Sequence, residues 1–362
     1  MPPGPFRFEL LATRGNLRLG RFHTPHGSFQ TPCFAPVGTY GALKGLTPEQ
    51  VRGTGAELIL ANSYHLHERP GEGTVRALGG LHRFMGWDGP ILTDSGGYQV
   101  FSLAGHRRVD DQGVTFRSLI DGSERRLTPR GALEIQRDLG PDIAMVLDEC
   151  PPGDASPAVV RAAHARTLLW AREQRDVHES WGGSGRGQAL FGIVQGGTDP
   201  ELRAASAQAL RELDFDGYAL GGLSVGETKD RMRVALAAAV PLLPEDRLRY
   251  LMGVGTPEDF ELAARTGIDL FDCVTPTRHA RNHEAFTSAG RVKMRNAQWA
   301  TDPGPLDPAC ACYTCARFSR GYLRHLAVCD EMLCGILLSI HNITHFQACM
   351  TRLRREAGGE SA

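Results

Sequence analysis

The sequence lacks the features that mark membrane, exported and dinucleotide-binding proteins. No apolar run in the 362-residue chain reaches about eighteen residues, so no segment predicts a membrane span. Residues 1–10 contain prolines and charges but no apolar core segment, so we expect no secretory signal and a cytoplasmic location. No Gly-x-Gly-x-x-Gly motif follows a predicted strand, which argues against a dinucleotide-binding sheet.

Charge is also nearly balanced. The net charge of −1 gives no overall attraction to nucleic acid, so any nucleic-acid surface must be local. The hydrophobic content of 41% is that of an ordinary globular protein, and the length allows one large domain with an insertion or two domains. Nine cysteines in a cytoplasmic chain favour thiols or metal ligands over disulfides.

Eight short apolar runs predict a fold of class α/β. They span residues 33–37, 58–61, 91–93, 143–147, 190–194, 218–220, 250–252 and 270–272. The runs are continuous rather than alternating, which is typical of strands buried on both faces. Helical patterns occupy residues 129–139, 157–177, 200–213, 229–240 and 257–265. This alternation predicts a (β/α)8 TIM barrel, with an open doubly wound sheet as the alternative and a hairpin excursion at 105–126.

Small or polar residues stand at the ends of several of these runs. They are Asp94, Asp148, Gln195, the pair Gly221 and Gly222, and Asp272. In a barrel all of these positions reach one rim, which is where such folds place their chemistry. Each residue alone could cap a turn, but unpaired carboxylates crowded on one rim repel each other. The set therefore predicts an active site rather than a structural feature.

Glycine pairs accompany these run ends. Ser95, Gly96, Gly97 and Tyr98 follow the first carboxylate, and further glycine pairs follow Gln195 and Leu220. Glycine allows close approach of the backbone to a ligand, and a tyrosine ring can stack on a flat one. Each glycine pair alone could be a tight turn. Three such pairs at the same rim of the barrel predict a planar ligand that the backbone contacts.

The eighth run ends in Asp272 and leads into a basic segment. A proline-bounded turn is expected after it, followed by Arg278, His279 and Arg281. Such a segment suits a phosphate-bearing substrate. Basic residues continue through the last quarter of the chain, where either a solvated face or a surface that follows a phosphate backbone fits the pattern.

A cysteine cluster predicts a metal site near the C-terminus. Cys310, Cys312 and Cys315 form a C-x-C-x2-C pattern, which needs a fourth ligand for a closed tetrahedral zinc site. His341, in an expected helix, is one candidate for that ligand. Cys329, Cys334 and His325 compete with it. Four protein ligands leave no open position, so the zinc would be structural.

At this point several motifs match a known family in order. They are DSGGYQ at 94–99, DEC at 148–150, GIVQG at 192–196, GGLSVGE at 221–227, MGVG at 252–255, FDCVTPTR at 271–278 and the cysteine pattern. The chain resembles bacterial tRNA-guanine transglycosylases over nearly its full length. The resemblance implies one catalytic barrel over 1–362 with a zinc-binding, tRNA-contacting subdomain at 278–345, and a homodimer. It implies exchange of the wobble guanine of G-U-N tRNAs (Asp, Asn, His, Tyr) for the base preQ1, toward queuosine.

The resemblance also assigns roles to residues. It implies Asp272 as nucleophile, Asp94 as proton acceptor, and His341 as the fourth zinc ligand. The base would be held by Asp94, Ser95, Gly96, Gly97, Tyr98, Asp148, Gln195 and Gly222. The RNA would be contacted by Gly253, Val254, Gly255, Thr256, Pro257, Glu258, Asp259, Thr277, Arg278, His279, Ala280 and Arg281.

The same chemistry follows from the residue types. Base exchange breaks and remakes one N-glycosidic bond, and retention favours a covalent carboxylate–sugar adduct as in retaining glycosidases. A second carboxylate can handle the proton of the base, a third can accept a purine N–H, and a glutamine can read a carbonyl. The target base must leave its stack, which costs less in an anticodon loop than in a duplex.

Some residues depart from the bacterial pattern. Ser224 stands where bacterial members often carry Ala, which is similar to queuine-using eukaryotic relatives. Cys150 and Val225 are bulkier than the residues expected in a queuine pocket, so preQ1 is favoured. Archaeal relatives carry additional C-terminal RNA-binding domains, for which this chain has no room.

Two other functions compete with this interpretation. A barrel hydrolase with a catalytic metal would need metal ligands at the strand ends and an open coordination position. A non-catalytic tRNA-binding subunit would be expected to lack Asp272 or Asp94.

Overall fold

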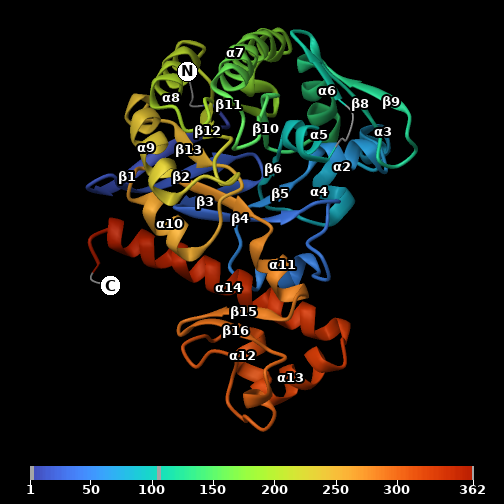
Figure 1. Ribbon diagram of the computed structural model, residues 1–362, viewed down its shortest axis with the longest axis vertical. Helices are drawn as coiled ribbons and strands as arrows, with labels where there is room; N and C mark the ends of the chain where they lie inside the picture. The colour runs from blue at the N-terminus through green and yellow to red at the C-terminus, as the bar shows by residue number, and fades with distance from the viewer. Residues whose placement is uncertain (1–3, 104–106, 361–362) are drawn as a thin grey trace.

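A closed barrel of eight parallel strands forms the body of the protein (Figure 1). The computed structural model describes residues 4–103 and 107–360. Around the barrel the strand order is β10-β11-β12-β13-β14-β4-β5-β6, which confirms the predicted TIM barrel over the open sheet. The barrel strands are β4 (Cys33–Gly38), β5 (Ile59–Ala61), β6 (Ile91–Thr93), β10 (Ile143–Met145), β11 (Ala189–Val194), β12 (Gly217–Leu220), β13 (Leu248–Leu251) and β14 (Leu270–Cys273).

Helices follow the barrel strands. They are α1 (Pro48–Arg52), α2 (Ser63–Glu68), α3 (Glu72–Ala77), α4 (Gly80–Met85), α5 (Gly97–Leu103), α6 (Pro129–Leu139), α7 (Pro157–Ser180), α8 (Pro200–Glu212), α9 (Lys229–Ala239) and α10 (Pro257–Ala264), with 3-10 turns η1 (Ser184–Arg186) and η2 (Val240–Leu242). The five predicted helices are present, and their ends shift by at most three residues, at Ser180. Four of these five begin with proline behind a capping Ser, Thr or Asp side chain, a pairing that satisfies free N–H groups. Among the described residues, no helix combines the length and apolarity needed to cross a membrane.

A three-stranded antiparallel sheet that the sequence did not reveal precedes the barrel. It comprises β1 (Arg7–Arg14), β2 (Leu17–Thr24) and β3 (Gly27–Thr31). Phe22 and Phe29 are fully buried, and the Phe22 ring lies 5.7 Å from that of Phe191 on β11. Arg18 forms a buried ion pair of 3.1 Å with Asp269, which directly precedes β14. The sheet therefore covers the end of the barrel where the strands begin.

A second antiparallel sheet lies between β6 and β10. Its strands are β7 (Arg107–Asp110), β8 (Gly113–Arg117) and β9 (Glu124–Leu127). The hairpin expected at 105–126 is therefore a sheet of three strands instead of two. Residues 105 and 106 of this expected segment lie outside the described residues. Trp170 of α7 is buried and donates from Nε1 to the carbonyl of Asp111, 2.8 Å away, which fixes this sheet against the barrel helices.

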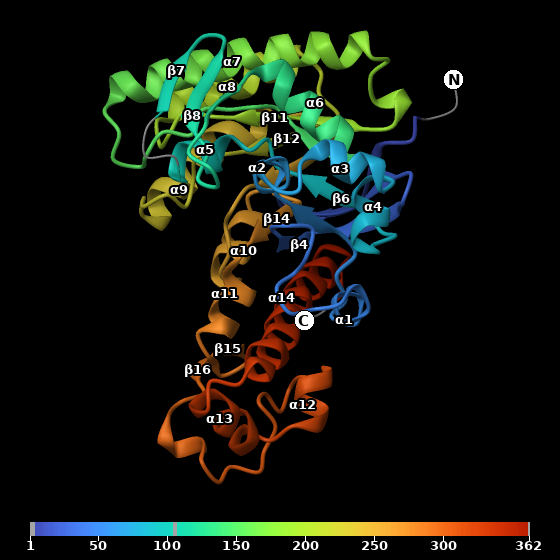
Figure 2. The ribbon, with the colours of Figure 1, turned by 90° about the vertical axis from the view of Figure 1, so that its right-hand side faces the viewer.

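A separate lobe follows β14. It contains α11 (Thr275–Arg281), β15 (Glu284–Thr287), β16 (Gly290–Lys293), η3 (Ala297–Trp299), α12 (Tyr313–Arg317) and α13 (Arg320–Val328), and leads into α14 (Met332–Ala357). Figure 2 shows β15 through α13 hanging away from the barrel, with α14 running back to it. The turn expected after Asp272 is instead the short helix α11, because Pro276 suits a helix N-terminus and Ala280 buries against α14.

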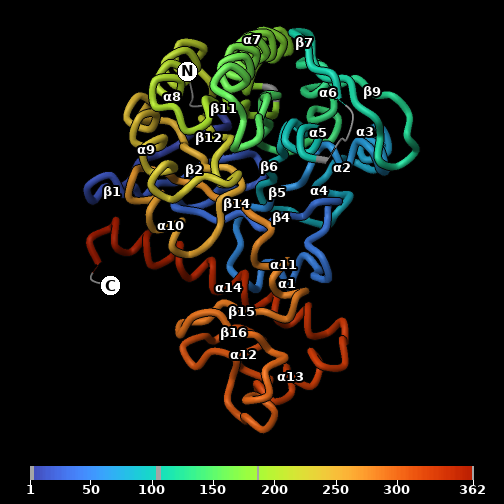
Figure 3. The backbone as a smooth tube through the Cα atoms, in the orientation of Figure 1, coloured from blue at the N-terminus to red at the C-terminus, as the bar shows by residue number. Residues whose placement is uncertain are grey.

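Helix α14 joins the lobe to the barrel. Its 26 residues span about 39 Å. At the barrel end, Gln347 donates from Nε2 to the Phe34 carbonyl at 2.8 Å, and Arg354 donates to the Pro32 carbonyl at 2.8 Å. In the backbone trace of Figure 3 the helix crosses beneath the barrel toward the C-terminus. A displacement of this helix would therefore shift contacts in both the barrel wall and the lobe.

Candidate active site and metal centre

The structure brings the predicted run-end residues to one rim of the barrel. Asp94 follows β6, Asp148 lies beyond β10, Gln195 follows β11, and Asp272 lies on β14. All four side chains are at most 8% exposed. Asp148 accepts hydrogen bonds from Gln195 Nε2 at 2.7 Å and from Ser95 Oγ at 3.3 Å, which links three different strand ends.

Asp94 is held entirely by neutral donors. Its Oδ2 accepts from Asn62 Nδ2 at 2.5 Å and from Gln99 Nε2 at 2.7 Å. Its Oδ1 accepts from the Ser63 backbone N–H at 2.8 Å and from Ser63 Oγ at 3.2 Å. Burial raises the pKa of Asp94, and these hydrogen bonds oppose the rise without cancelling it. A carboxyl group whose pKa is raised in this way can both accept and return a proton.

Asp272 is anchored through one oxygen only. Its Oδ1 accepts from Tyr250 OH at 2.6 Å and from the Gly253 backbone N–H at 2.7 Å. Its Oδ2 has no hydrogen-bond partner among the described residues. Burial raises the pKa of Asp272 to about 6, against the pull of these donors, and the Asp94 charge raises it further. One fixed oxygen orients the group, while the other is left for a ligand.

Glycine backbones pack against the polar groups of the rim. A Cβ atom at Gly222 would lie 2.4 Å from Gln195 Oε1, and one at Gly97 would lie 2.7 Å from the Asp148 carbonyl. Gly222 also has a positive φ of 65°. Gln195 Oε1 is buried without a hydrogen-bond partner among the described residues. An unpaired buried acceptor is costly, so we expect a ligand or an ordered water to donate to it.

Burial also raises the pKa of Asp148 to about 6, because the Gln195 and Ser95 hydrogen bonds only partly offset the loss of water. The negative charge of Asp94 adds to the shift. Asp94, Asp148 and Asp272 form no ion pair within the described residues. Three carboxyl groups without a basic partner agree with a functional rather than a structural set.

Several supporting residues escaped the sequence analysis. They are Asn62, Ser63, Gln99, Tyr250 and Arg203. Arg203 of α8 is fully buried and donates to the carbonyls of Gly197 at 2.7 Å and Val194 at 2.9 Å, which fixes the glycine loop after β11. Asn62 directly follows the predicted run 58–61, and Tyr250 lies within the run 250–252. Their places at predicted strands could therefore have suggested a role at the rim. Nothing local distinguishes Arg203 from a surface arginine.

The remaining base-binding candidates lie beside this set. Ser95 and Gly97 contact Asp148, and a Cβ atom at Gly96 would lie 3.3 Å from Ser63 Oγ. Tyr98, on α5, is 54% exposed, so its ring is accessible at the mouth of the site.

The two expected RNA-binding segments have partly structural roles. Thr256 and Asp259 form a capping box at the start of α10, and a Cβ atom at Gly255 would lie 1.9 Å from Cys273 Sγ. Val254, Thr277 and Ala280 are buried, and His279 bonds Glu284 at 2.7 Å. Gly253, Pro257 and Glu258 lie at or beside the start of α10. Arg278 and Arg281 are exposed on α11, the helix that directly follows Asp272.

The basic last quarter is partly neutralised. Arg295 pairs with Asp330 at 2.9 Å and Arg320 pairs with Asp302 at 3.1 Å. Within residues 4–103 and 107–360, by contrast, Arg278, Arg281 and Arg291 have no ion pair. Their positive charge is therefore available to a polyanion.

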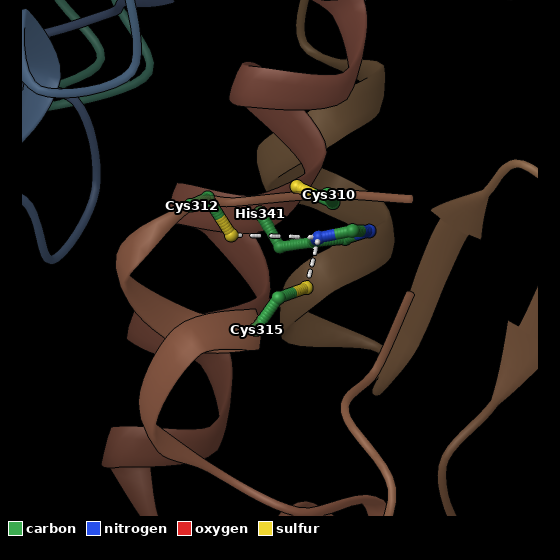
Figure 4. Close-up of side chains that lie close together, drawn as sticks. All are labelled: Cys310, Cys312, Cys315 and His341. Atoms are coloured by element: carbon green, nitrogen blue, oxygen red, sulfur yellow. Dashed lines mark hydrogen bonds between the residues drawn. The ribbon is translucent and has the colours of Figure 1, made fainter. Parts of the chain in front are cut away.

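Four predicted metal ligands converge in the lobe. The donor atoms of Cys310, Cys312, Cys315 and His341 lie within 4.8 Å of one another, so the cluster could hold one metal ion (Figure 4). His341 Nδ1 lies 3.6 Å from Cys312 Sγ and 3.2 Å from Cys315 Sγ. His341 Nε2 donates to the Phe286 carbonyl at 2.7 Å, which leaves Nδ1 as the ligand atom.

The rival ligands lie outside this cluster. Cys329 is exposed and lies near His325, with 3.8 Å between Cys329 Sγ and His325 Nδ1. Cys334 donates to the Leu323 carbonyl instead. His341 is therefore the fourth member of the set.

Comparison with known proteins agrees with this geometry. The family model described as queuine tRNA-ribosyltransferase matches residues 14–358. The chain belongs to the queuine tRNA-ribosyltransferase family. It is 52% identical to the queuine tRNA-ribosyltransferase of Solidesulfovibrio magneticus, with 97% of this chain and 93% of the relative covered. It is 51% identical to that of Saccharophagus degradans (98% and 94% covered) and 53% identical to that of Pelotomaculum thermopropionicum (93% and 90% covered). The resemblance drawn from the motifs is thus confirmed: the protein is a pentosyltransferase of tRNA, a tRNA-guanine transglycosylase of queuosine synthesis.

Removal of one donor tests the metal centre. We expect Cys312→Ala to destabilise the lobe, because metal binding there contributes folding free energy. Urea unfolding and metal content would be measured together, with the exposed Cys329→Ala as the matched control. A Cys312→Ala protein with unchanged stability and metal content would contradict a structural metal site.

Proposed function

We propose that this enzyme exchanges the wobble guanine of G-U-N tRNAs for preQ1 through a covalent Asp272–ribose adduct. The observation that carries the proposal is the state of Asp272: Oδ1 is fixed by Tyr250 and Gly253, and Oδ2 lacks a partner among the described residues. A carboxylate held in this way is oriented for attack on a sugar carbon.

The exchange needs two displacements at ribose C1′. Asp272 Oδ2 forms a bond to C1′ as the bond from C1′ to guanine N9 breaks. Guanine leaves with that electron pair and takes up the proton of the Asp94 carboxyl group, which is left ionised. PreQ1 then attacks C1′ with its N9, the ester bond to Asp272 breaks, and the N9 proton passes to Asp94. Two inversions give net retention, as in retaining glycosidases. No net hydrolysis occurs, because the second nucleophile is the incoming base.

Recognition of the base rests on Asp148 and Gln195. The ionised Asp148 carboxylate accepts hydrogen bonds from the N–H edge that guanine and preQ1 share. Gln195 Nε2 already donates one hydrogen to Asp148 and has a second for the purine carbonyl. The Tyr98 ring stacks on the face of the base once the base has left the anticodon stack.

The RNA backbone is held by the exposed arginines of α11 and by Arg291 on β16. These side chains lack ion-pair partners within the described residues. Arg278 and Arg281 lie on the helix that follows Asp272, and Arg291 lies in the lobe. The subdomain at 278–345 presents them, and tRNAs for Asp, Asn, His and Tyr are the substrates. Homodimer formation remains a prediction from the resemblance, and a cytoplasmic location remains a prediction from the N-terminal sequence.

The metal of the lobe is Zn2+, one ion per chain. Three thiolates and one imidazole form the ligand set of closed, structural zinc sites. A second donor cluster among the described residues lies at the other end of the barrel, and neither cluster includes a rim carboxylate. This arrangement does not favour a hydrolase with a metal at the strand ends.

Substitution of the nucleophile tests the covalent step. We expect Asp272→Asn to lower the exchange rate by about 10³-fold or more, because a neutral amide is a poor nucleophile, while tRNA binding persists. Exchange of labelled guanine into a G-U-N tRNA would measure the rate and map the label. Wild-type protein should give a gel-stable complex with tRNA that Asp272→Asn does not give. The exposed Asp246→Asn serves as control, and a covalent complex with Asp272→Asn would refute the assignment.

The pH dependence follows from the same groups. Asp272 and Asp148 have folded-state pKa values of about 6, above the ordinary value of an aspartate, so both are protonated and inactive in acid. We expect the single-turnover exchange rate to rise with pH through about 6 and then level off. The free energy of unfolding should fall as the pH rises from about 4 to 6, because ionisation of buried carboxyl groups destabilises the folded protein. A rate that stays flat from pH 5 to 7 would contradict these assignments.

Base preference tests the choice of preQ1. Cys150 is buried at the base site, and Val225 packs closely on Gly153, where a Cβ atom would lie 2.7 Å from the Val225 carbonyl. Both side chains are bulkier than the residues expected in a queuine pocket, which favours preQ1. We expect a higher kcat/KM for preQ1 when purified enzyme is offered both bases. Better incorporation of queuine would overturn this preference.

A further inference from the structure

A second cluster of metal-binding side chains lies at the end of the barrel opposite the active site. His26 is in the turn between β2 and β3, His82 is on α4, and Asp142 directly precedes β10. Their ligand atoms lie within 4.8 Å of one another. Asp142 stands at the start of the strand beyond whose end Asp148 lies, so the cluster is separate from the rim.

The two imidazoles converge on one carboxylate. His26 Nδ1 lies 2.8 Å from Asp142 Oδ1, and His82 Nε2 lies 3.1 Å from Asp142 Oδ2. The two rings are stacked, with 3.5 Å between their centroids and 16° between their planes. Near-parallel rings cannot both direct a lone pair at one ion, so binding requires one imidazole to rotate. The three donor atoms lie within 4.8 Å of one another, which is close enough for a common ion after that rotation.

The carboxylate is held in place for this contact. The Ile91 backbone N–H donates to Asp142 Oδ2 at 2.9 Å. The Asp142 backbone donates to the Ile91 carbonyl and accepts from the Ala189 N–H, both at 2.9 Å. These bonds to β6 and β11 fix the carboxylate independently of the histidines. A metal site with a fixed ligand loses little conformational entropy on binding.

The buried charge of Asp142 also favours a bound cation. Asp142 is 0% exposed and has no lysine or arginine partner within residues 4–103 and 107–360. A buried carboxylate needs a compensating cation. Two protonated imidazoles stacked face to face would repel each other. A single divalent ion would compensate the carboxylate without that repulsion.

We propose that His26, His82 and Asp142 bind a divalent first-row transition-metal ion of the Zn2+, Ni2+ or Co2+ type. Two imidazole nitrogens and a carboxylate are the donor set that these ions share. The His26 side chain is 43% exposed, so one side of the site is open to solvent and to water ligands. The ion joins the β2–β3 turn and α4 to the start of β10, and so fastens the N-terminal sheet to the barrel. This inference does not depend on the proposed function.

Metal counting tests the site in full-length protein without a histidine tag. After equilibrium dialysis against micromolar free Zn2+, wild-type protein should hold one ion per chain more than His26→Gln or His82→Gln. His23→Gln, on the same sheet but outside the cluster, should match wild type. Asp142→Asn is less suitable, because the carboxylate also accepts the Ile91 N–H. Equal zinc content in wild type and both cluster variants would overturn the proposal and leave a hydrogen-bonded His–Asp–His clamp.

Two further readouts separate this site from the cysteine cluster. Co2+ bound to thiolates gives an intense charge-transfer absorption band. The His26→Gln and His82→Gln variants should therefore bind one Co2+ fewer than wild type, while the band from the cysteine cluster stays unchanged. Added Zn2+ should raise the Tm of wild type more than that of His26→Gln. Guanine exchange by His26→Gln should equal that of wild type, because the site is remote from the rim. If His82→Gln lost one Co2+ and the thiolate band together, the lost ion would have been bound by the cysteines. That result would refute the proposal.

Discussion

Burial of three carboxyl groups at the barrel mouth, without a basic partner among the described residues, is the constraint on which the rest of the structure depends. Removing such groups from water is unfavourable, and the neutral donors around Asp94, Asp148 and Asp272 offset only part of that cost, as their raised pKa values show. The surrounding fold must therefore hold them in place. Strained or desolvated groups of this kind persist only where the scaffold is rigid.

The scaffold supplies this rigidity from several directions. Tyr250 and Gly253 lie on and after β13 and hold Asp272 on the adjacent strand β14. Arg203 holds the glycine loop after β11 from behind. At the other end of the barrel, the N-terminal sheet and the Arg18–Asp269 pair close the core. Closure of that end leaves the strand C-termini as the open end of the barrel, where the chemistry is placed.

The metal centre contributes to the active site through helix packing. His341 and Asn342 are neighbours on α14: His341 donates to the Phe286 carbonyl, and Asn342 accepts from the Phe286 N–H at 2.9 Å. Asn342 also donates to the Pro276 carbonyl at 3.0 Å, at the start of α11. A metal ion that fixes His341 therefore also fixes the helix that follows Asp272 and carries Arg278. This chain of contacts gives a physical reason for a structural metal in the lobe.

The sequence alone determined the barrel, the rim residues and the cysteine ligands, because each depends on local order: continuous apolar runs, the residue at each run end, and the spacing of Cys310, Cys312 and Cys315. It did not reveal the β1–β3 sheet, whose strands mix charged and polar residues with apolar ones and form no continuous apolar run, or the helix α11 in place of a turn. Only the tertiary structure decided that His341 rather than Cys329, Cys334 or His325 completes the metal set, and that Arg203 and Tyr250 support the rim. It alone brought together His26, His82 and Asp142, which are separated by 55 and 59 residues in the chain. Local sequence sets secondary structure and strand ends, but contacts between distant segments exist only once the barrel has closed.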